Sequence, residues 1–229
     1  NGFFTGSGIP YYSVDIRHKD TFSCLPTKNI YGCIHFAAAL PSRYEYDPGL
    51  FIDSITVGTL NVLDYLKSSG CRKIVFAQTP FDSWYLHNTT NTIPADGLRS
   101  FPPTGDHSVY AIAKNAAVDL IEHYYRSFGI ARFILRFFTI YQYHPNPYHY
   151  GDGIRKIMPY RILIDKAMKG ETIEIWGDPS RKKEIVYVKD FTQAVHKSII
   201  SDLEGGIYNV GGVKTVSLEE QILGIIEVF

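Results

Sequence analysis

The sequence has little that would tie the protein to nucleic acid, to a membrane or to an oxidising compartment. Its 23 lysines and arginines balance 23 aspartates and glutamates, so no excess of positive charge indicates nucleic acid or an anionic lipid surface as a partner. No apolar run approaches the roughly 20 residues that a membrane-spanning helix needs, and no basic-then-apolar leader opens the chain. We therefore expect no nucleic-acid partner, no membrane and a cytoplasmic location.

Cysteine is also scarce in this chain. Only Cys24, Cys33 and Cys71 are present, and they are too few and too scattered for a disulfide framework or a zinc site. Their number and spacing favour reduced thiols in a reducing compartment, and no metal site is expected.

The chain has an ordinary hydrophobic content of 45% over 229 residues, enough for a core in one large domain or two modest lobes. Short apolar runs rich in Ile, Val, Phe and Tyr alternate with longer helical patterns. Two long helices are predicted at Leu50–Ser69 and Tyr110–Phe128, each followed by a glycine that suits a helix C-cap. The short runs predict strands at Tyr11–Ile16, Gly32–Phe36, Lys73–Ala77 and Arg132–Phe138.

This order predicts a Rossmann-like α/β fold with a doubly wound parallel sheet, because right-handed crossovers place helices on both faces. After about residue 140 the chain becomes rich in Pro, Gly, Tyr and His, and shorter elements follow. We expect residues 1–140 to form the Rossmann domain and residues 141–229 mostly a smaller mixed α/β lobe, interleaved with the main sheet. The chain begins at Asn1 and ends within an apolar helical pattern, Leu218–Phe229, which predicts a fragment truncated at its C-terminus.

The predicted strands end in residues that suit a ligand site. In an open parallel sheet, ligands bind beyond the carboxyl ends of the strands. The ends here are small or hydroxyl-bearing: Ala37–Ala39, Gln78-Thr79 and Thr139. Small residues let a flat cofactor approach the backbone, and a hydroxyl both donates and accepts hydrogen bonds. The alternative is that the alanines merely end a strand beneath a helix.

A Tyr-x-x-x-Lys spacing, Tyr110 to Lys114, opens the second long helix. Positions i and i+4 of a helix share one face, so the phenol and the ammonium are expected side by side. A cation beside a phenol lowers the tyrosine pKa from its usual value of about 10, which makes the tyrosine a usable general base. Roughly one such spacing is expected by chance in a chain with 17 tyrosines, so its position in the fold carries more weight than the spacing.

These motifs stand in an order that resembles a known family. From about residue 13 to about residue 220 the chain is similar to the extended short-chain dehydrogenase/reductase family, in its NAD-dependent epimerase/dehydratase group. The resemblance rests on runs that follow one another at the family's spacing: Val14–Arg17, His35–Ala38, Gly58–Leu63, Val75–Thr79, Tyr110–Lys114, Leu135–Tyr141, Gly177-Asp178, Ile185–Asp190 and Tyr208–Gly211.

The resemblance implies a bound NAD, with NADP left open, and a role for each matching residue. The cofactor-binding residues that it implies, from the adenine to the nicotinamide, are Asp15, Ile16, Phe36, Ala37, Ala38, Tyr110, Lys114 and Phe138. Tyr110 is the implied proton carrier, Lys114 the residue that holds the nicotinamide ribose, and Thr79 the hydroxyl that bridges the sugar and the tyrosine. Thr139 and Lys183 are implied to face the substrate, together with Thr79.

The chain also departs from the family pattern. The family opens with a glycine-rich turn that cradles the pyrophosphate, but Ile9 and Tyr12 follow Thr5–Gly8 where glycines belong. The sequence therefore predicts that the first βαβ unit is missing, or else that the dinucleotide is held in another way. Dehydratases of this group carry an Asp-Glu pair directly after the threonine; Pro80 and Phe81 stand there, and neither transfers protons.

The function implied by the resemblance is an epimerase acting on a nucleotide-diphosphate sugar through transient oxidation by bound NAD. One alternative is an NAD(P)-dependent sugar or carbonyl reductase, which differs in consuming cofactor stoichiometrically. Another is a non-catalytic binding protein, since a fold does not imply an activity. A homodimer through the two long helices is a further expectation from the family.

Overall fold

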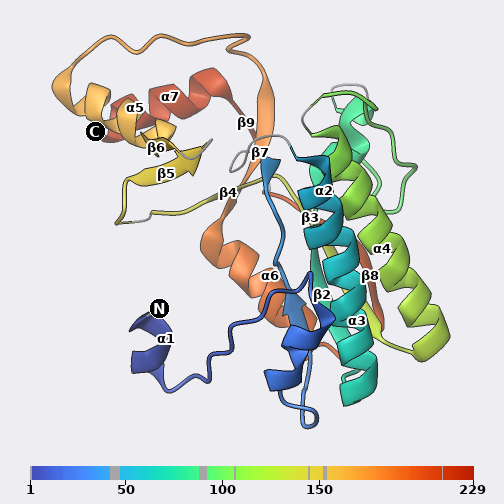
Figure 1. The fold of residues 1–229 in the computed structure, drawn as a ribbon. Coiled ribbons are helices and arrows are strands. Elements are labelled where there is room, and N and C mark those ends of the chain that lie inside the picture. Colours follow the sequence, from blue (N-terminus) through green and yellow to red (C-terminus); the bar gives the residue numbers. More distant parts are fainter. Residues whose placement is uncertain are drawn as a thin grey trace.

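A four-stranded parallel sheet forms the centre of the protein (Figure 1). The computed structural model describes residues 2–41, 47–87, 92–105, 107–143, 145–151, 154–212 and 214–229. In spatial order the strands are β1 (Cys33–His35), β2 (Lys73–Gln78), β3 (Ala131–Phe137) and β8 (Gly205–Val210). Every neighbouring pair is parallel, so the carboxyl ends of all four strands meet at one edge.

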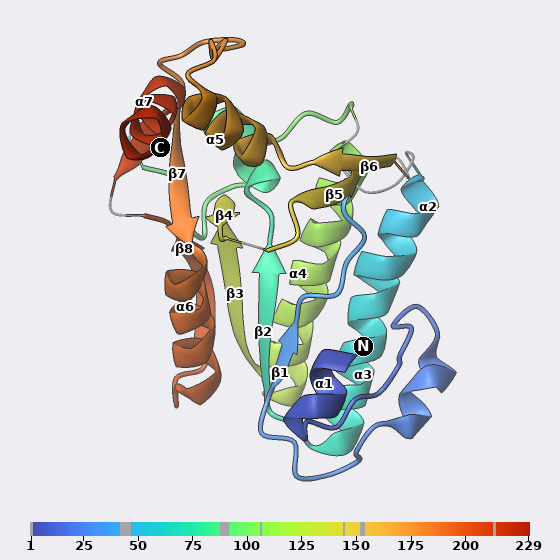
Figure 2. The same cartoon turned by 90° about the vertical axis from the view of Figure 1, so that its left-hand side faces the viewer.

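Helices cover both faces of this sheet, as the alternation of strand residues requires. Ile74, Phe76 and Ile134 pack in the larger hydrophobic core with α3 (Gly58–Ser69) and α4 (Ser108–Phe128). On the other face, the alternate residues Val75, Phe133 and Leu135 pack with α6 (Val188–Ile200). The doubly wound α/β fold predicted from the sequence is confirmed (Figure 2).

The first predicted long helix is present in three consecutive segments. They are α2 (Pro48–Phe51), the π-helical segment η3 (Ile52–Val57) and α3. The Asp47 side chain accepts a hydrogen bond from the Leu50 N–H at the start, which satisfies one of the free donors of a helix N-terminus. Gly70 and Gly129 end α3 and α4 with φ of 72° and 66°, a conformation that glycine adopts without strain.

The strand predicted at Tyr11–Ile16 is wrong. This segment follows α1 (Gly2–Ser7) in an extended path without a strand partner and leads to η1 (Lys19–Cys24). Its backbone is held by side chains instead, since Asn61 Nδ2 donates to the Ile16 carbonyl over 2.8 Å and Thr21 Oγ1 donates to the Asp15 carbonyl over 2.8 Å. The β-rich composition reflects the packing of Val14 and Ile16 on the larger core.

A smaller set of elements lies beyond the carboxyl edge of the main sheet (Figures 1 and 2). It contains a sheet of β4 (Thr139–Tyr141), β7 (Lys182–Tyr187) and β9 (Thr215–Ser217), and a hairpin of β5 (Tyr148–Gly151) and β6 (Ile154–Ile157). Two helices, α5 (Pro159–Lys169) and α7 (Leu218–Val228), pack on each other there. The chain leaves this small lobe between β7 and β9 to add α6 and β8 to the main sheet.

None of the helices in the described ranges is long and apolar enough to cross a membrane.

Candidate functional site

Tyr110 and Lys114 lie in the first turns of α4, on the face that packs against the sheet. They are only 8% and 3% exposed. The ammonium of Lys114 donates to the Ala77 carbonyl over 2.8 Å, lies 4.5 Å from the centroid of the Phe76 ring, and lies 5.9 Å from that of the Tyr110 ring. The helix therefore presents both side chains to the carboxyl end of β2.

Thr79 completes a cluster with these two residues. It follows β2 directly, is 4% exposed, and its side chain forms a hydrogen bond with the Tyr110 side chain. On its other side the Tyr110 ring meets the Phe51 ring edge-on, with centroids 6.1 Å apart. The structure brings together the three residues predicted from the sequence to be catalytic.

The predicted effect of Lys114 on Tyr110 is wrong for the protein without cofactor. Burial raises the pKa of Tyr110 to about 12, and the hydrogen bond from Thr79 offsets this only in part. Burial also lowers the pKa of Lys114 to about 8. The expectation failed because the ammonium is directed at the Ala77 carbonyl, and because desolvation opposes the charged form of both groups.

The predicted cofactor residues at the ends of β1 and β3 reach the same edge of the sheet. Phe36, Ala37 and Ala38 follow β1; Phe36 is exposed and its ring contacts Phe191 of α6, with centroids 5.7 Å apart. Phe138 follows β3 and its ring lies 5.2 Å from that of His87. These side chains line the carboxyl edge on either side of Thr79.

Asp15 and Ile16 are held against α3 rather than near Tyr110. Arg17 donates to the Asp15 carboxylate over 2.6 Å, and its hydrogen bonds hold the pKa of Asp15 at about 2. Ile16 contacts Gly58, where an added Cβ would lie 2.7 Å from the Ile16 side chain. Gly58 therefore lets the Asp15–Ile16 segment approach the helix closely.

His35 is a buried residue at this edge that the sequence-based site did not include. Its Nε2 lies 3.0 Å from Thr59 Oγ1, and burial, assisted by the positive charge of Lys114, lowers its pKa to about 3. A neutral imidazole thus fixes the end of β1 to α3. Thr59 and Asn61 could have been found from the Gly58–Leu63 run, whose polar residues recur within an apolar helical pattern.

The two further residues predicted to face the substrate lie in the small lobe. Thr139 is exposed at the start of β4, and Lys183 on β7 holds its ammonium 5.4 Å from the centroid of the Tyr141 ring. Because Thr139 pairs with Ile185, Lys183 lies two residues along the adjacent strand. The contacts of both residues lie within the small lobe, with Ile185 for Thr139 and with Tyr141 for Lys183.

The residues at this edge fit the nicotinamide end of a dinucleotide better than its phosphate end. Thr79, Tyr110 and Lys114 offer two hydroxyls and an ammonium at one place, a donor set suited to a ribose and a reacting hydroxyl. The Thr5–Gly8 run supplies no phosphate cradle, because Gly8, with φ of 69°, follows the C-terminus of α1. Anions bind at helix N-termini, where backbone N–H groups are free.

The segment that follows Thr79, described from Pro80 to His87, contains one carboxylate, and that carboxylate is engaged in a buried ion pair. Pro80 and Phe81 begin the 3₁₀ segment η4 (Pro80–Leu86), and Asp82 follows them. The Asp82 carboxylate accepts from Arg136 Nη2 over 2.6 Å and from Gln78 Nε2 over 3.2 Å, with Asp82 only 1% exposed. This buried ion pair leaves no acid in the place where dehydratases of the group carry theirs.

Comparison with known families identifies the group to which this arrangement belongs. The sequence profile of the NAD dependent epimerase/dehydratase family matches residues 6–211. The chain belongs to this family. The resemblance inferred from the motifs is thereby confirmed.

Individual relatives agree with the family match. A putative UDP-glucose 4-epimerase of Methanocaldococcus jannaschii is 28% identical over 92% of this chain, which spans 65% of that relative's length. The crystal structure of Thermus thermophilus UDP-glucose 4-epimerase in complex with NAD is 28% identical, with a TM-score of 0.67 over 96% of this chain and 69% of its own. A Thermotoga maritima UDP-glucose 4-epimerase, solved with UDP-glucose, shares the fold with a TM-score of 0.77 at 20% identity, over 96% of this chain and 68% of its own.

Proposed function

We propose that this chain forms the greater part of an NAD-dependent epimerase that inverts a carbon of a nucleotide-diphosphate sugar. The observation that carries the proposal is the buried cluster of Thr79, Tyr110 and Lys114 at the carboxyl edge of a parallel sheet. Two of the proteins similar to this chain are named as UDP-glucose 4-epimerases, and one of these was solved with NAD. Bound NAD would supply the hydride acceptor and donor at this edge.

Tyr110 is the residue that would take the proton of the sugar hydroxyl and return it. Its pKa of about 12 means that the free protein holds a neutral phenol at neutral pH. Base strength must therefore come from positive charge within the buried site, which acts strongly there because water is excluded. Lys114 contributes one such charge, and Thr79 can relay the proton between substrate and phenol.

The same residues argue against dehydration as the reaction. Water elimination needs a carboxylic acid within reach of the leaving hydroxyl. Pro80 and Phe81 carry none, and Asp82 is held by Arg136 and Gln78. Transient oxidation followed by reduction needs no such acid.

We assign the dinucleotide to residues 1–140 and the sugar nucleotide mostly to residues 141–229. In this assignment Asp15 and Ile16 lie at the adenine end and Phe138 at the nicotinamide. Thr139 and Lys183 meet the substrate, whose diphosphate suits a lysine as a point charge. Lys183 is partly exposed on β7, the central strand of the small sheet, and this position supports its part in the proposal.

We also propose a homodimer located in the cytoplasm. Val57, Leu60 and Ile112 are exposed apolar residues on the two long helical segments, and burying them against a second copy would remove them from water. The three cysteines are all free, which agrees with a reducing compartment.

The decisive experiment incubates the purified protein with NAD and a panel of UDP- and dTDP-sugars. We expect interconversion of two epimers, followed by NMR, without net change in NADH absorbance. Tyr110→Phe serves as the matched control and should abolish the interconversion. Stoichiometric consumption of cofactor would instead identify a reductase, and failure to bind NAD or any sugar nucleotide would contradict the enzymatic proposal.

A further inference from the structure

A buried glutamine, Gln78, joins the two elements that carry the proposed catalytic residues. It is the last residue of β2, and its Oε1 accepts a hydrogen bond from the Thr79 backbone N–H over 2.9 Å. Its Nε2 donates to Asn115 Oδ1 over 3.0 Å and to Asp82 Oδ2 over 3.2 Å. Both polar atoms of this amide are thus engaged, in three hydrogen bonds in all.

These contacts matter because Gln78 and Asn115 are each adjacent in the sequence to a proposed catalytic residue. Gln78 directly precedes Thr79, and Asn115 directly follows Lys114. The hydrogen bond between Gln78 and Asn115 therefore ties the strand end that carries Thr79 to the helix that carries Tyr110 and Lys114.

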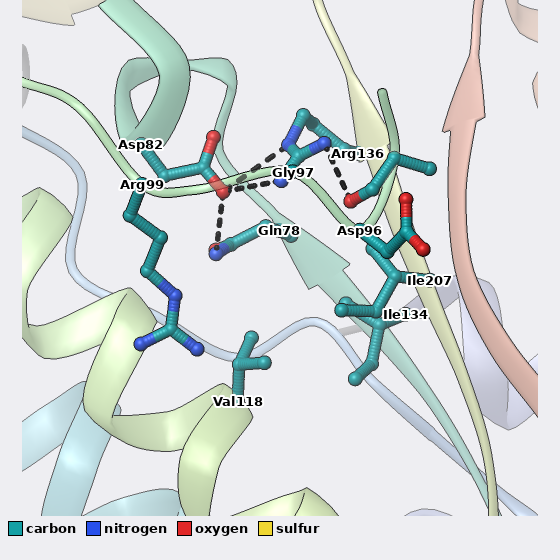
Figure 3. A pocket seen from close by; sticks show the side chains of 10 residues that line it. Gln78, Asp82, Asp96, Gly97, Arg99, Val118, Ile134, Arg136 and Ile207 are labelled. Atoms are coloured by element: carbon teal, nitrogen blue, oxygen red, sulfur yellow. Dashed lines mark hydrogen bonds and ion pairs between the residues drawn. The ribbon is translucent and has the colours of Figure 1, made fainter. Parts of the chain in front are cut away.

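Arg136 on the adjacent strand β3 holds Asp82, one of the hydrogen-bond partners of Gln78, in place (Figure 3). It pairs with Gln78 in the sheet register and donates to Asp82 Oδ2 through both Nε and Nη2, over 3.2 and 2.6 Å. Its Nη1 donates to Asn209 Oδ1 over 2.9 Å and to the Ala95 carbonyl over 3.0 Å. Asp82 is consequently fixed as an acceptor for the Gln78 amide.

Packing alone does not hold the Gln78 side chain in place. A cavity of about 130 Å³ lies beside it, bounded also by Val118, Ile134 and the Arg99 side chain (Figure 3). Because that side is open, hydrogen bonds decide the orientation of the amide. A buried amide that loses its partners leaves polar groups unsatisfied, which is costly.

We infer that Gln78 is a positioning residue that holds the Thr79 hydroxyl against Tyr110. The inference rests on the proposed function, since it concerns the same site. In this role Gln78 acts through Thr79, whose backbone N–H it holds. Displacing a catalytic group by about 1 Å typically costs about 10²-fold in rate, so the placement of Thr79 matters to turnover.

The test uses Gln78→Met, which keeps the length of the side chain and removes all three hydrogen bonds. The ¹³Cζ resonance of Tyr110, in protein labelled at tyrosine and assigned through Tyr110→Phe, reports on the phenol hydrogen bond at neutral pH. We expect Gln78→Met to shift this resonance in the same direction as Thr79→Val. In the double variant, Gln78→Met should add no further shift to that of Thr79→Val, because both act on one contact.

Gln221→Met is the matched control, since the Gln221 amide is also hydrogen-bonded through both its oxygen and its nitrogen, to Tyr141 and to the Ser217 carbonyl, but in the small lobe. It should leave the Tyr110 resonance unchanged. Asn115→Ala provides a second route if Gln78→Met does not fold, and should shift the resonance in the same direction by a smaller amount. An unchanged Tyr110 resonance in whichever of these two variants folds, or additive shifts in the double variant, would overturn the inference.

Kinetics supply an independent readout once the substrate is known. Gln78→Met should lower kcat about 10- to 100-fold while KM stays within about twofold. The NMR experiment needs neither cofactor nor turnover. An inactive protein would therefore contradict the proposed function, while the Tyr110 resonance would still show whether Gln78 positions Thr79.

Discussion

The carboxyl edge of the main sheet and the small lobe hold their polar side chains in opposite ways. At the sheet edge, Thr79, Tyr110 and Lys114 are buried, and each has a defined partner. In the small lobe, Thr139 and Lys182 are exposed, and α5 has no buried residue. A preorganised buried site suits chemistry, because its dipoles need not reorganise during the reaction. An exposed lobe suits recognition, because its charged side chains remain accessible to a ligand.

The ion pairs of the two regions show the same contrast. Arg136 and Asp82 form a pair with side chains that are 6% and 1% exposed. Lys169 and Asp165 form a pair of similar length on α5, but both side chains are more than half exposed. Removing one partner of a buried ion pair is costly, because it leaves the other charge buried and unpaired. Exposed ion pairs contribute little to the free energy of unfolding.

Tyr110→Phe should produce the largest effect in either region. Removing the phenol oxygen removes the proton carrier, and we expect kcat to fall by about 10³-fold or more. The free energy of unfolding should change by less than about 1 kcal/mol, because the ring and its contact with Phe51 remain. Steady-state kinetics and urea unfolding measure the two quantities, and turnover within tenfold of the parent would exclude Tyr110 as the proton carrier.

Arg136→Met tests the buried ion pair. It leaves the Asp82 carboxylate without its cation in a buried position, and we expect a loss of about 3–5 kcal/mol in the free energy of unfolding. Lys169→Met, the exposed counterpart, should cost less than about 1 kcal/mol. Urea unfolding of both variants measures the difference, and equal losses would show that burial does not distinguish the two pairs.

Lys114→Met tests the electrostatic cost of the buried ammonium. The pKa of Lys114 is about 8 in the folded protein, against an ordinary value of 10.5 for a lysine side chain in water. Below pH 8 both states hold the proton. Between pH 8 and 10.5 the unfolded state binds more protons, so the stability of the parent should rise with pH. Relative to Lys114→Met, the rise should be on the order of 3 kcal/mol, since each pKa unit is worth about 1.4 kcal/mol.

The measurement for Lys114 is urea unfolding of parent and variant at several pH values without cofactor. Taking the difference removes the contribution of other titrating groups. A constant difference from pH 8 to 10.5 would show that Lys114 keeps an ordinary pKa in the folded protein.

Lys183→Met should have the smallest effect and should act on substrate binding alone. Loss of one partly exposed charge that meets the substrate diphosphate should raise KM about tenfold, which corresponds to about 1.4 kcal/mol, with kcat unchanged. Lys182→Met is the control, because adjacent strand residues point to opposite faces. Equal effects of the two substitutions would indicate general attraction by the basic lobe rather than a contact made by Lys183.

Much of the fold followed from local patterns. The two long helices and the strands at β1, β2 and β3 were predictable from apolar periodicity and from the glycines that end the helices. The Tyr11–Ile16 strand was not, because a strand exists only where another strand pairs with it, and composition does not supply the partner. Arg136, which directly follows the apolar run Phe133–Leu135 in β3, was the available signal for the buried network around Gln78.

The sequence by itself determined that Tyr110 and Lys114 share one face of a helix, since four residues make about one turn. It also determined the family, because the order of the motifs can be read from the sequence alone. Only the tertiary structure decided what surrounds the pair. Burial raises the pKa of Tyr110, and the Ala77 carbonyl accepts a hydrogen bond from the Lys114 ammonium. Gln78 links the end of β2, next to Thr79, to α4 through Asn115. Desolvation and long-range hydrogen bonds depend on residues far apart in the chain, so spacing alone cannot predict them.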